Sequence, residues 1–185
     1  MPMNFIPSYP STPEHESKKE ILDDNARKFI TEAIEPTFLE EHDAISFKMV
    51  VDWLETGEDN EKKIVYKKFD DGTVQILLIS KVTEDGNRTS EKEKIPEEKY
   101  NELLVASKLH LEKRRTEFEF IQNDVPFSLK YDEFGDEKLR ILEIDASDNE
   151  NRDSFDFNNF PTKLFEITGD IRFYGYRMTG IVESL

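Results

Sequence analysis

Charged residues two positions apart recur in several short runs of this sequence. The clearest runs are Glu91 with Glu93, alternate positions from Lys113 to Glu119, Lys130 with Asp132, and Glu143 with Asp145. Side chains alternate between the faces of a β-strand, so residues two apart share a face and lie roughly 6 to 7 Å from each other. Carboxylates so placed can bind a hard cation such as Mg²⁺ or Mn²⁺, and lysine and arginine side chains can neutralise phosphate oxygens. Chemistry on a triphosphate needs both kinds of group.

Each charged run, taken alone, also fits the solvent face of an ordinary half-buried sheet. Their recurrence on many strands favours another arrangement, in which the sheet closes and its charged faces meet in one lumen. There, a metal that bridges phosphoryl oxygens, together with a positioned water, could hydrolyse a terminal phosphate.

Eight segments have the composition of short β-strands, because they are rich in branched or aromatic residues and are bounded by Asp, Gly, Asn or Pro. These segments are 44–54, 63–69, 73–82, 88–95, 111–121, 126–134, 138–146 and 163–168. Asp70-Asp71-Gly72 and Asp85-Gly86-Asn87 are tight-turn sequences between neighbouring segments, so the connections are antiparallel. The predicted fold class is α+β, an antiparallel, closed or nearly closed eight-stranded β-barrel with flanking helices.

Two helices are predicted beside this barrel. Residues 14–35 carry apolar residues near helical spacing and end before Pro36, and residues 97–109 follow Pro96, a favourable residue for a helix start. Residues 1–13 hold four of the eight prolines and are predicted to be a flexible tail. We therefore expect a tail, 1–13, and a single β-barrel domain, 14–185, with an N-terminal helix.

Composition narrows the choice of partners and location. The formal net charge of −16 disfavours long nucleic acid, since an acidic surface repels a phosphate backbone. The sequence has no cysteine, no signal-peptide pattern and no long apolar run, so we expect a cytoplasmic protein without a membrane partner. The three histidines are spread along the chain and do not suggest a zinc site. The choice between monomer and homodimer is left open.

From Lys81 to about Tyr176 the sequence resembles the CYTH superfamily, the triphosphate tunnel metalloenzymes that include class IV adenylate cyclases and thiamine triphosphatases. Its motifs occur in the family's order along roughly half of the chain. They are Lys81, Arg88, Glu91-x-Glu93 before Ile95-Pro96, Lys113-x-Arg115, Asp132-x-Phe134, Glu143-x-Asp145 and the run Glu166-Ile167-Thr168-Gly169-Asp170-Ile171-Arg172-Phe173. Each motif is weak alone, and the shared order makes the set fairly specific.

For the site, the resemblance implies phosphate-binding, metal-binding and catalytic side chains inside one tunnel. The phosphate-binding set is Lys67, Lys81, Arg88, Lys113 and Arg115. The metal-binding set, for Mg²⁺ or Mn²⁺, is Asp132, Glu143 and Asp145, and the catalytic set is Lys48, Lys81, Glu91 and Glu93. The resemblance also implies that Glu91 and Glu93 line the tunnel and that Glu166 lies near its mouth.

The family's opening strand, Glu-x-Glu-x-Lys, has no intact copy here. One register places residues 33–37 on it and keeps Glu35, and the other places residues 44–48 on it and keeps Lys48. We favour the second, because Pro36 fits a strand badly. A lysine also stands at Lys67 where the family has arginine, which keeps a point charge for phosphate but forfeits the bidentate fork.

The predicted function is divalent-metal-dependent hydrolysis of a small triphosphate, such as inorganic triphosphate, a nucleoside triphosphate or thiamine triphosphate. Since the opening carboxylates are altered, two alternatives stay open. One is a domain that binds polyphosphate or nucleotide without turnover, and the other is a class IV-type adenylate cyclase. A third alternative, of a different class, is an acidic interaction protein whose tail or first helix recruits a partner.

Overall fold

The computed structural model describes residues 18–21, 26–85 and 87–185 of the chain. Its strands are β1 (Lys18–Ile21), β2 (Arg27–Thr31), β3 (Ile45–Thr56), β4 (Asn60–Phe69), β5 (Val74–Glu84), β6 (Asn87–Lys94), β7 (Leu109–Gln122), β8 (Val125–Phe134), β9 (Leu139–Asp145) and β10 (Leu164–Glu166). They form one antiparallel sheet of ten strands in the order β1-β6-β5-β4-β3-β7-β8-β9-β2-β10. All eight predicted strands are confirmed, as β3 to β10, and the sheet has two more than predicted.

The predicted helix at residues 14–35 is wrong wherever the structure describes it. Residues Lys18–Ile21 pair with β6, and Arg27–Thr31 lies between β9 and β10. Phe29, on β2, is fully buried against the outer face of the sheet, so pairing and packing override the helical spacing of the apolar residues. Residues 14–17 and 22–25 and the predicted tail, 1–13, lie outside the described residues.

Four short α-helices accompany the sheet in the described part of the chain: α1 (Pro36–Glu41), α2 (Glu97–Leu104), α3 (Asn149–Asp153) and α4 (Met178–Glu183). Three 3-10 turns, η1 (Phe157–Asn159), η2 (Ile171–Phe173) and η3 (Gly175–Arg177), lie between them. The second predicted helix is confirmed but ends at Leu104, because Leu109 already pairs with Trp53 in the sheet. Within these ranges no helix has the length and apolarity that a membrane crossing requires.

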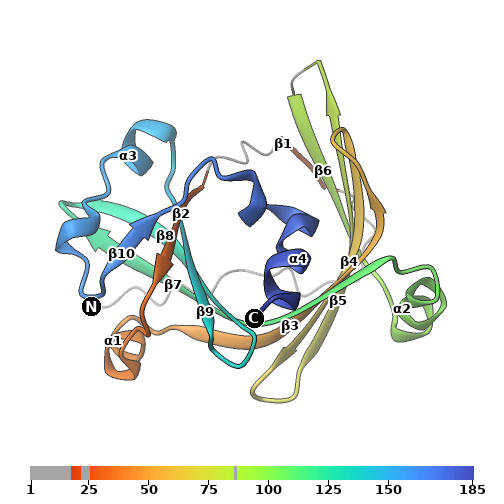
Figure 1. The fold of residues 1–185 in the computed structure, drawn as a ribbon, viewed down its shortest axis with the longest axis horizontal. Helices are drawn as coiled ribbons and strands as arrows, with labels where there is room; N and C mark the ends of the chain where they lie inside the picture. Colours follow the sequence, from red (N-terminus) through yellow and green to blue (C-terminus); the bar gives the residue numbers. More distant parts are fainter. Residues whose placement is uncertain (1–17, 22–25, 86) are drawn as a thin grey trace.

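The sheet curls around an interior but is not closed by hydrogen bonds. The edge strands β1 and β10 stand at opposite ends of the strand order, and no pairing between them is found among the described residues. The curled sheet has two arms, one made by β3 to β6 and the other by β7 to β10 with β2. In Figure 1 the C-terminal segment, in dark blue, lies between these arms. The closed form of the predicted barrel is therefore not seen, and the C-terminal segment fills part of the interior.

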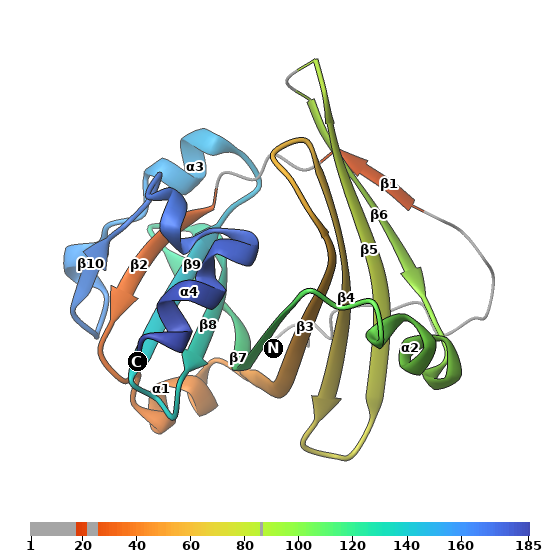
Figure 2. The same ribbon diagram turned by 45° about the vertical axis from the view of Figure 1, so that its right-hand side comes forward.

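Apolar packing divides between the outer and inner faces of the sheet. Outside, α2 lies on the arm made by β3 to β6, as Figure 2 shows, and its Tyr100 and Leu103 cover Ile64 and Ile76. On the other arm, β2 and β7 to β9 pack outward against α1 and the segment from α3 to η1. Inside, Met178 of α4 belongs to one apolar cluster with residues of β3, β4, β5, β7, β8 and β9. Part of the interior is thus an apolar core, and the charged cavity occupies the rest.

The hairpin between β4 and β5 shows how local sequence sets these strands. Gly72 has a φ of +87°, and its N–H donates to the carbonyl oxygen of Phe69 at 3.0 Å. Oδ1 of Asp71 accepts a hydrogen bond from the Thr73 N–H at 2.8 Å. Glycine tolerates the left-handed backbone that this turn requires. The predicted antiparallel connection is confirmed.

Candidate functional site

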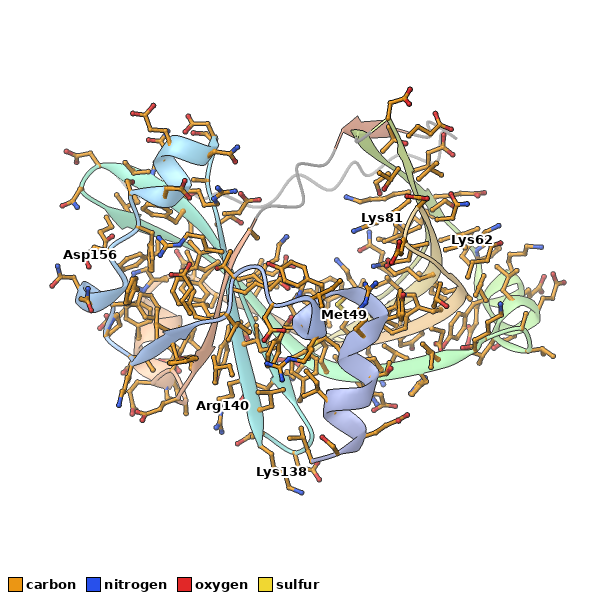
Figure 3. All side chains as sticks on the ribbon, turned by 45° about the horizontal axis from the view of Figure 1, so that its top comes forward. Met49, Lys62, Lys81, Lys138, Arg140 and Asp156 are labelled. Atoms are coloured by element: carbon orange, nitrogen blue, oxygen red, sulfur yellow. The ribbon has the colours of Figure 1, made fainter. Side chains whose placement is uncertain are left out.

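A cavity of about 740 Å³ lies on the inner face of the sheet. Among the described residues that line it, nine are basic and five are acidic. The whole chain has the opposite balance, with 25 basic and 41 acidic residues. Side-chain alternation produces this sorting, and Figure 3 shows it on one arm, where Lys81 faces the interior and Lys62 lies on the outer side. The cavity is therefore a local region of positive charge inside an acidic protein.

Asp132 of β8 is the centre of one wall of the cavity. It is 1% exposed, and the register of the sheet places it directly opposite Arg115 of β7. Its carboxylate accepts hydrogen bonds from Arg115 Nε at 2.7 Å, from Arg115 Nη2 at 2.6 Å and from Lys113 Nζ at 2.7 Å. Burial by itself would raise the pKa of Asp132, but the charges of Arg115 and Lys113 outweigh it and lower that pKa. The carboxylate therefore stays ionised and holds both cations in place.

Glu143 of β9, whose side chain is 21% exposed, forms a second, partly buried cluster beside the first. It pairs with Lys28 on β2, where Nζ lies 3.2 Å from Oε1, and its Oε2 lies 3.7 Å from Nη2 of Arg115. Burial opposes ionisation of Glu143, but Arg115, Lys28 and Lys113 lower its pKa far below the ordinary value. Arg115 thus links the two carboxylates into one network.

Two lysines of the cavity, Lys113 and Lys67, lie in surroundings that disfavour a positive charge. Burial, and then the charge of Arg115, lower the pKa of Lys113 to about 8. Burial also lowers the pKa of Lys67, an effect that Glu117 opposes and that Arg115 and Lys130 strengthen. Both shifts reflect desolvated positive charge, which a bound anion would relieve.

The C-terminal segment covers one side of the cavity. Nζ of Lys28 donates a hydrogen bond to the carbonyl oxygen of Phe173 at 3.1 Å and lies 3.9 Å from the ring centroid of Tyr174. On the other side, a Cβ added to Gly175 would lie 3.0 Å from Oε2 of Glu61 on β4. Gly175 has a φ of +53°, so both its backbone and the close approach favour glycine. The segment therefore bridges the two arms that strand pairing leaves apart.

Six of the predicted site residues line this cavity. They are Lys67, Lys81, Lys113, Arg115, Asp132 and Glu143, from five different strands. Of these, Lys113, Arg115, Asp132 and Glu143 belong to the network described above. Arg88 lies on β6, and its side chain is outside the described residues.

The structure places four other predicted residues outside the cavity. Glu91 and Glu93 were expected to line the tunnel, but they are exposed on the outer face of β6, because the intervening Lys92 faces inward. Lys48 is exposed on the outer face of β3 and lies 2.9 Å from Glu112. Asp145 is the exposed last residue of β9, and its Oδ1 accepts a hydrogen bond from the Ala146 N–H at 2.9 Å.

Glu166, expected near the mouth of the tunnel, lies on β10. Its Oε1 is 2.9 Å from Nε of Arg27, which is on the outward-facing side of β2. Glu166 is not among the residues that line the cavity. Its ion pair and the Thr168 hydroxyl, which donates to Oε1 at 2.9 Å, give it a structural role in joining β10 to β2.

Lys28 is the member of the Glu143 cluster that sequence reasoning missed. Neither predicted register of the opening strand is correct, since residues 33–37 run into the start of α1 and Lys48 points outward. The strand that brings a lysine to Glu143 is β2. The run Asp24-Asn25-Ala26-Arg27-Lys28 ends in lysine with the spacing of the family's opening motif, and this spacing was the available signal. Read this way, Ala26 stands where the family has its second glutamate.

The donor set does not fit a Mg²⁺ or Mn²⁺ site. Across residues 18–21, 26–85 and 87–185, no group of three Asp, Glu, His or Cys side chains could hold a metal ion. Of the predicted metal-binding residues, Asp132 and Glu143 lie near each other but pair with cations, and Asp145 lies at an exposed strand end. Ala26 supplies no carboxylate, and Asp24 lies outside the described residues.

Comparison with solved structures identifies the architecture. A crystal structure described as the inorganic triphosphatase NE1496 matches with a TM-score of 0.57 and 16% identity, over 83% of this chain and 95% of that chain. A second, described as the hypothetical protein NE1496, matches with a TM-score of 0.55, 16% identity and the same coverage of 83% and 95%. The chain has a CYTH-like fold. At this identity the likeness establishes the fold alone.

Sequence comparison adds nothing to this assignment: no protein-family model matches the chain, and no curated protein matches it. The CYTH-like fold is therefore recognised from the path of the backbone and from the short motifs on its strands. What the cavity binds has to be argued from its own residues.

Proposed function

We propose that this chain binds a triphosphate compound in the cavity of its CYTH-like fold and hydrolyses its terminal phosphate. The single observation that supports this proposal best is the reversed charge balance, with basic side chains in excess inside the cavity of a strongly acidic chain. Sheet curvature concentrates these cations in one space, where their field is less screened than on an open surface. A small polyanion is the ligand that such a space favours.

The proposed binding groups are Arg115, Lys113 and Lys28. Arg115 carries a planar fork that suits phosphate oxygens, and Asp132 fixes the orientation of that fork. Lys28 and Lys113 add point charges from opposite sides of the same network. Because buried partners already hold these side chains, little ordering entropy is lost when phosphate binds.

The size of the cavity, about 740 Å³, agrees with a small-molecule ligand. Inorganic triphosphate, a nucleoside triphosphate and thiamine triphosphate are the candidate substrates. Hydrolysis transfers the terminal phosphoryl group to water, and the cavity cations would stabilise the negative charge on the phosphate oxygens.

A second candidate function is binding of the triphosphate without turnover. Binding without turnover is favoured because Asp132 and Glu143 form ion pairs with basic side chains, and because Ala26 stands where the opening motif has a carboxylate. In that case the cavity would retain its charge and lose the groups that activate water.

The test measures phosphate release and binding with the same protein. Purified full-length chain is assayed with inorganic triphosphate, ATP and thiamine triphosphate, with Mg²⁺, with Mn²⁺ and with chelator, and cyclic AMP is measured in the ATP samples. Release that is lost in Lys113→Ala supports hydrolysis. Binding without release supports the second candidate, and cyclic AMP would identify a cyclase instead. Absence of both binding and release would overturn the proposal.

A further inference from the structure

Two acidic side chains of the cavity, Asp132 and Glu143, have cations as partners at short distance. Asp132 accepts three hydrogen bonds from Arg115 and Lys113, all at 2.6 or 2.7 Å. Glu143 lies 3.2 Å from Nζ of Lys28. Magnesium needs near-octahedral oxygen ligands at roughly 2.0 to 2.1 Å and usually takes one or two carboxylates. At Asp132, whose two oxygens already accept three hydrogen bonds, a metal ion would have to displace a cation partner.

Giving up such a partner is costly. Asp132 is 1% exposed, so Arg115 and Lys113 would remain desolvated with less compensating charge. A metal ion would also add two positive charges to a cavity in which basic side chains already outnumber acidic ones, nine to five. Both considerations disfavour a metal ion beside Asp132 and Glu143.

We infer that this cavity takes its polyphosphate as the metal-free anion, and that Asp132 and Glu143 are positioning counter-ions for Arg115, Lys113 and Lys28. The inference rests on the proposed function, because it names the form in which the proposed ligand binds. In this arrangement the lysines and Arg115 do the charge neutralisation that a metal ion does elsewhere. The excess of four basic over acidic side chains is comparable to the charge of inorganic triphosphate near neutral pH.

The two possible roles of Glu143 predict opposite effects of Glu143→Gln on the affinity for the ligand. If Glu143 bound a metal that bridges to phosphate, Glu143→Gln would weaken ligand binding. If Glu143 is a counter-ion, the same change removes a negative charge beside the bound anion and strengthens binding. One unit charge at roughly 6 Å, with an effective dielectric constant of about 40, corresponds to about a tenfold change in affinity.

The experiment is calorimetric titration of the full-length chain with inorganic triphosphate, in chelator and then in excess Mg²⁺ or Mn²⁺. We expect binding in chelator to be as tight as with metal, or tighter, because the metal also competes for the free anion. We expect Glu143→Gln to bind about tenfold tighter in chelator. Glu117→Gln, which also removes a charge from the cavity wall, should shift affinity in the same direction.

Glu112→Gln is the matched control. It removes the same charge from the exposed outer face of β7, where Glu112 pairs with Lys48, so its affinity should change less than about twofold. Thermal unfolding of each variant shows whether it is folded. If Glu143→Gln does not fold, the affinity of Glu117→Gln still decides the test.

The outcomes separate this inference from the proposed function. Binding that requires Mg²⁺ or Mn²⁺, or weaker binding by Glu143→Gln and Glu117→Gln, overturns the metal-free form and leaves triphosphate binding intact. Absence of binding both in chelator and with metal overturns the proposed function as well.

Discussion

Arg115 and Asp132 face each other across β7 and β8 as a directly paired couple, joined by two hydrogen bonds of 2.7 and 2.6 Å. The Asp132 side chain is buried and that of Arg115 is 12% exposed, and Asp132 also holds Lys113. An antiparallel register thus joins two separate strands into one wall of the proposed phosphate-binding cavity. The stability of the fold and the geometry of the site depend on the same carboxylate.

Asp132→Asn is therefore expected to destabilise the protein. The change leaves Arg115 and Lys113 buried without their shared counter-ion, which costs about 3 to 5 kcal/mol for a buried ion pair broken on one side. Urea unfolding followed by circular dichroism measures the loss. Asp145→Asn, at the exposed end of β9, is the control and should stay within about 0.5 kcal/mol of the parent. Equal effects of the two changes would contradict the role given to Asp132.

Acid should destabilise the folded chain through Asp132 and Glu143. Both have a folded-state pKa below the ordinary values of 3.8 and 4.5. Their contribution is therefore complete above the unfolded pKa and is lost as the pH falls below it, toward the folded pKa. The free energy of unfolding, measured by urea titration at a series of pH values, should fall steadily below pH 4.5. Glu143→Gln should show a shallower decline, and an unchanged slope would count against the ion pair with Lys28.

His110 should have the opposite effect to Asp132 and Glu143 on the pH dependence of stability, because it stabilises the fold at low pH. Its Nδ1 lies 2.8 Å from Oδ1 of Asp52, which is 1% exposed, and the hydrogen bond that the ring N–H donates to this carboxylate raises the pKa of His110 above 6.5. This contribution is present below the unfolded pKa and disappears as the pH rises through the folded pKa. The melting temperature should thus drop as the pH rises from below 6.5 through the raised folded pKa, and the drop should be smaller in His110→Gln. His42→Gln, on α1's C-terminal end, is the control and should keep the full drop.

Lys113 should make triphosphate binding depend on pH. Its pKa is about 8 in the free protein, so it loses charge as the pH rises through that value. A bound anion favours the charged form, so affinity falls above pH 8 and binding near pH 8 takes up protons. Titration calorimetry in buffers of different ionisation enthalpy measures this uptake. Lys113→Arg, which stays charged, should bind without it, and proton uptake that persists in this variant would assign the effect to another group.

Local pattern predicted β3 to β10 correctly because each predicted segment is short, rich in branched or aromatic residues and bounded by Asp, Gly, Asn or Pro. It could not find β2, since Arg27–Thr31 is short and its partners, β9 and β10, are distant in sequence. For the site, alternation showed which residues share a face but not which face turns inward. Glu91 and Glu93 share their face with Ile95, which packs under α2, so the outer helix decides their side. That packing is a tertiary fact that strand spacing does not contain.

The same alternation supplies the most direct test of the cavity, on one strand. Lys67 lines the cavity from β4, and its neighbour Lys68 is exposed on the opposite face. Because Lys67 lies among Arg115, Lys130 and Glu117, Lys67→Ala should weaken binding of inorganic triphosphate about tenfold. Lys68→Ala removes an identical charge from the outer face and should change the affinity less than about twofold. Equal losses in the two variants would show that the ligand responds only to the total charge of the chain. The cavity would then not be the binding site.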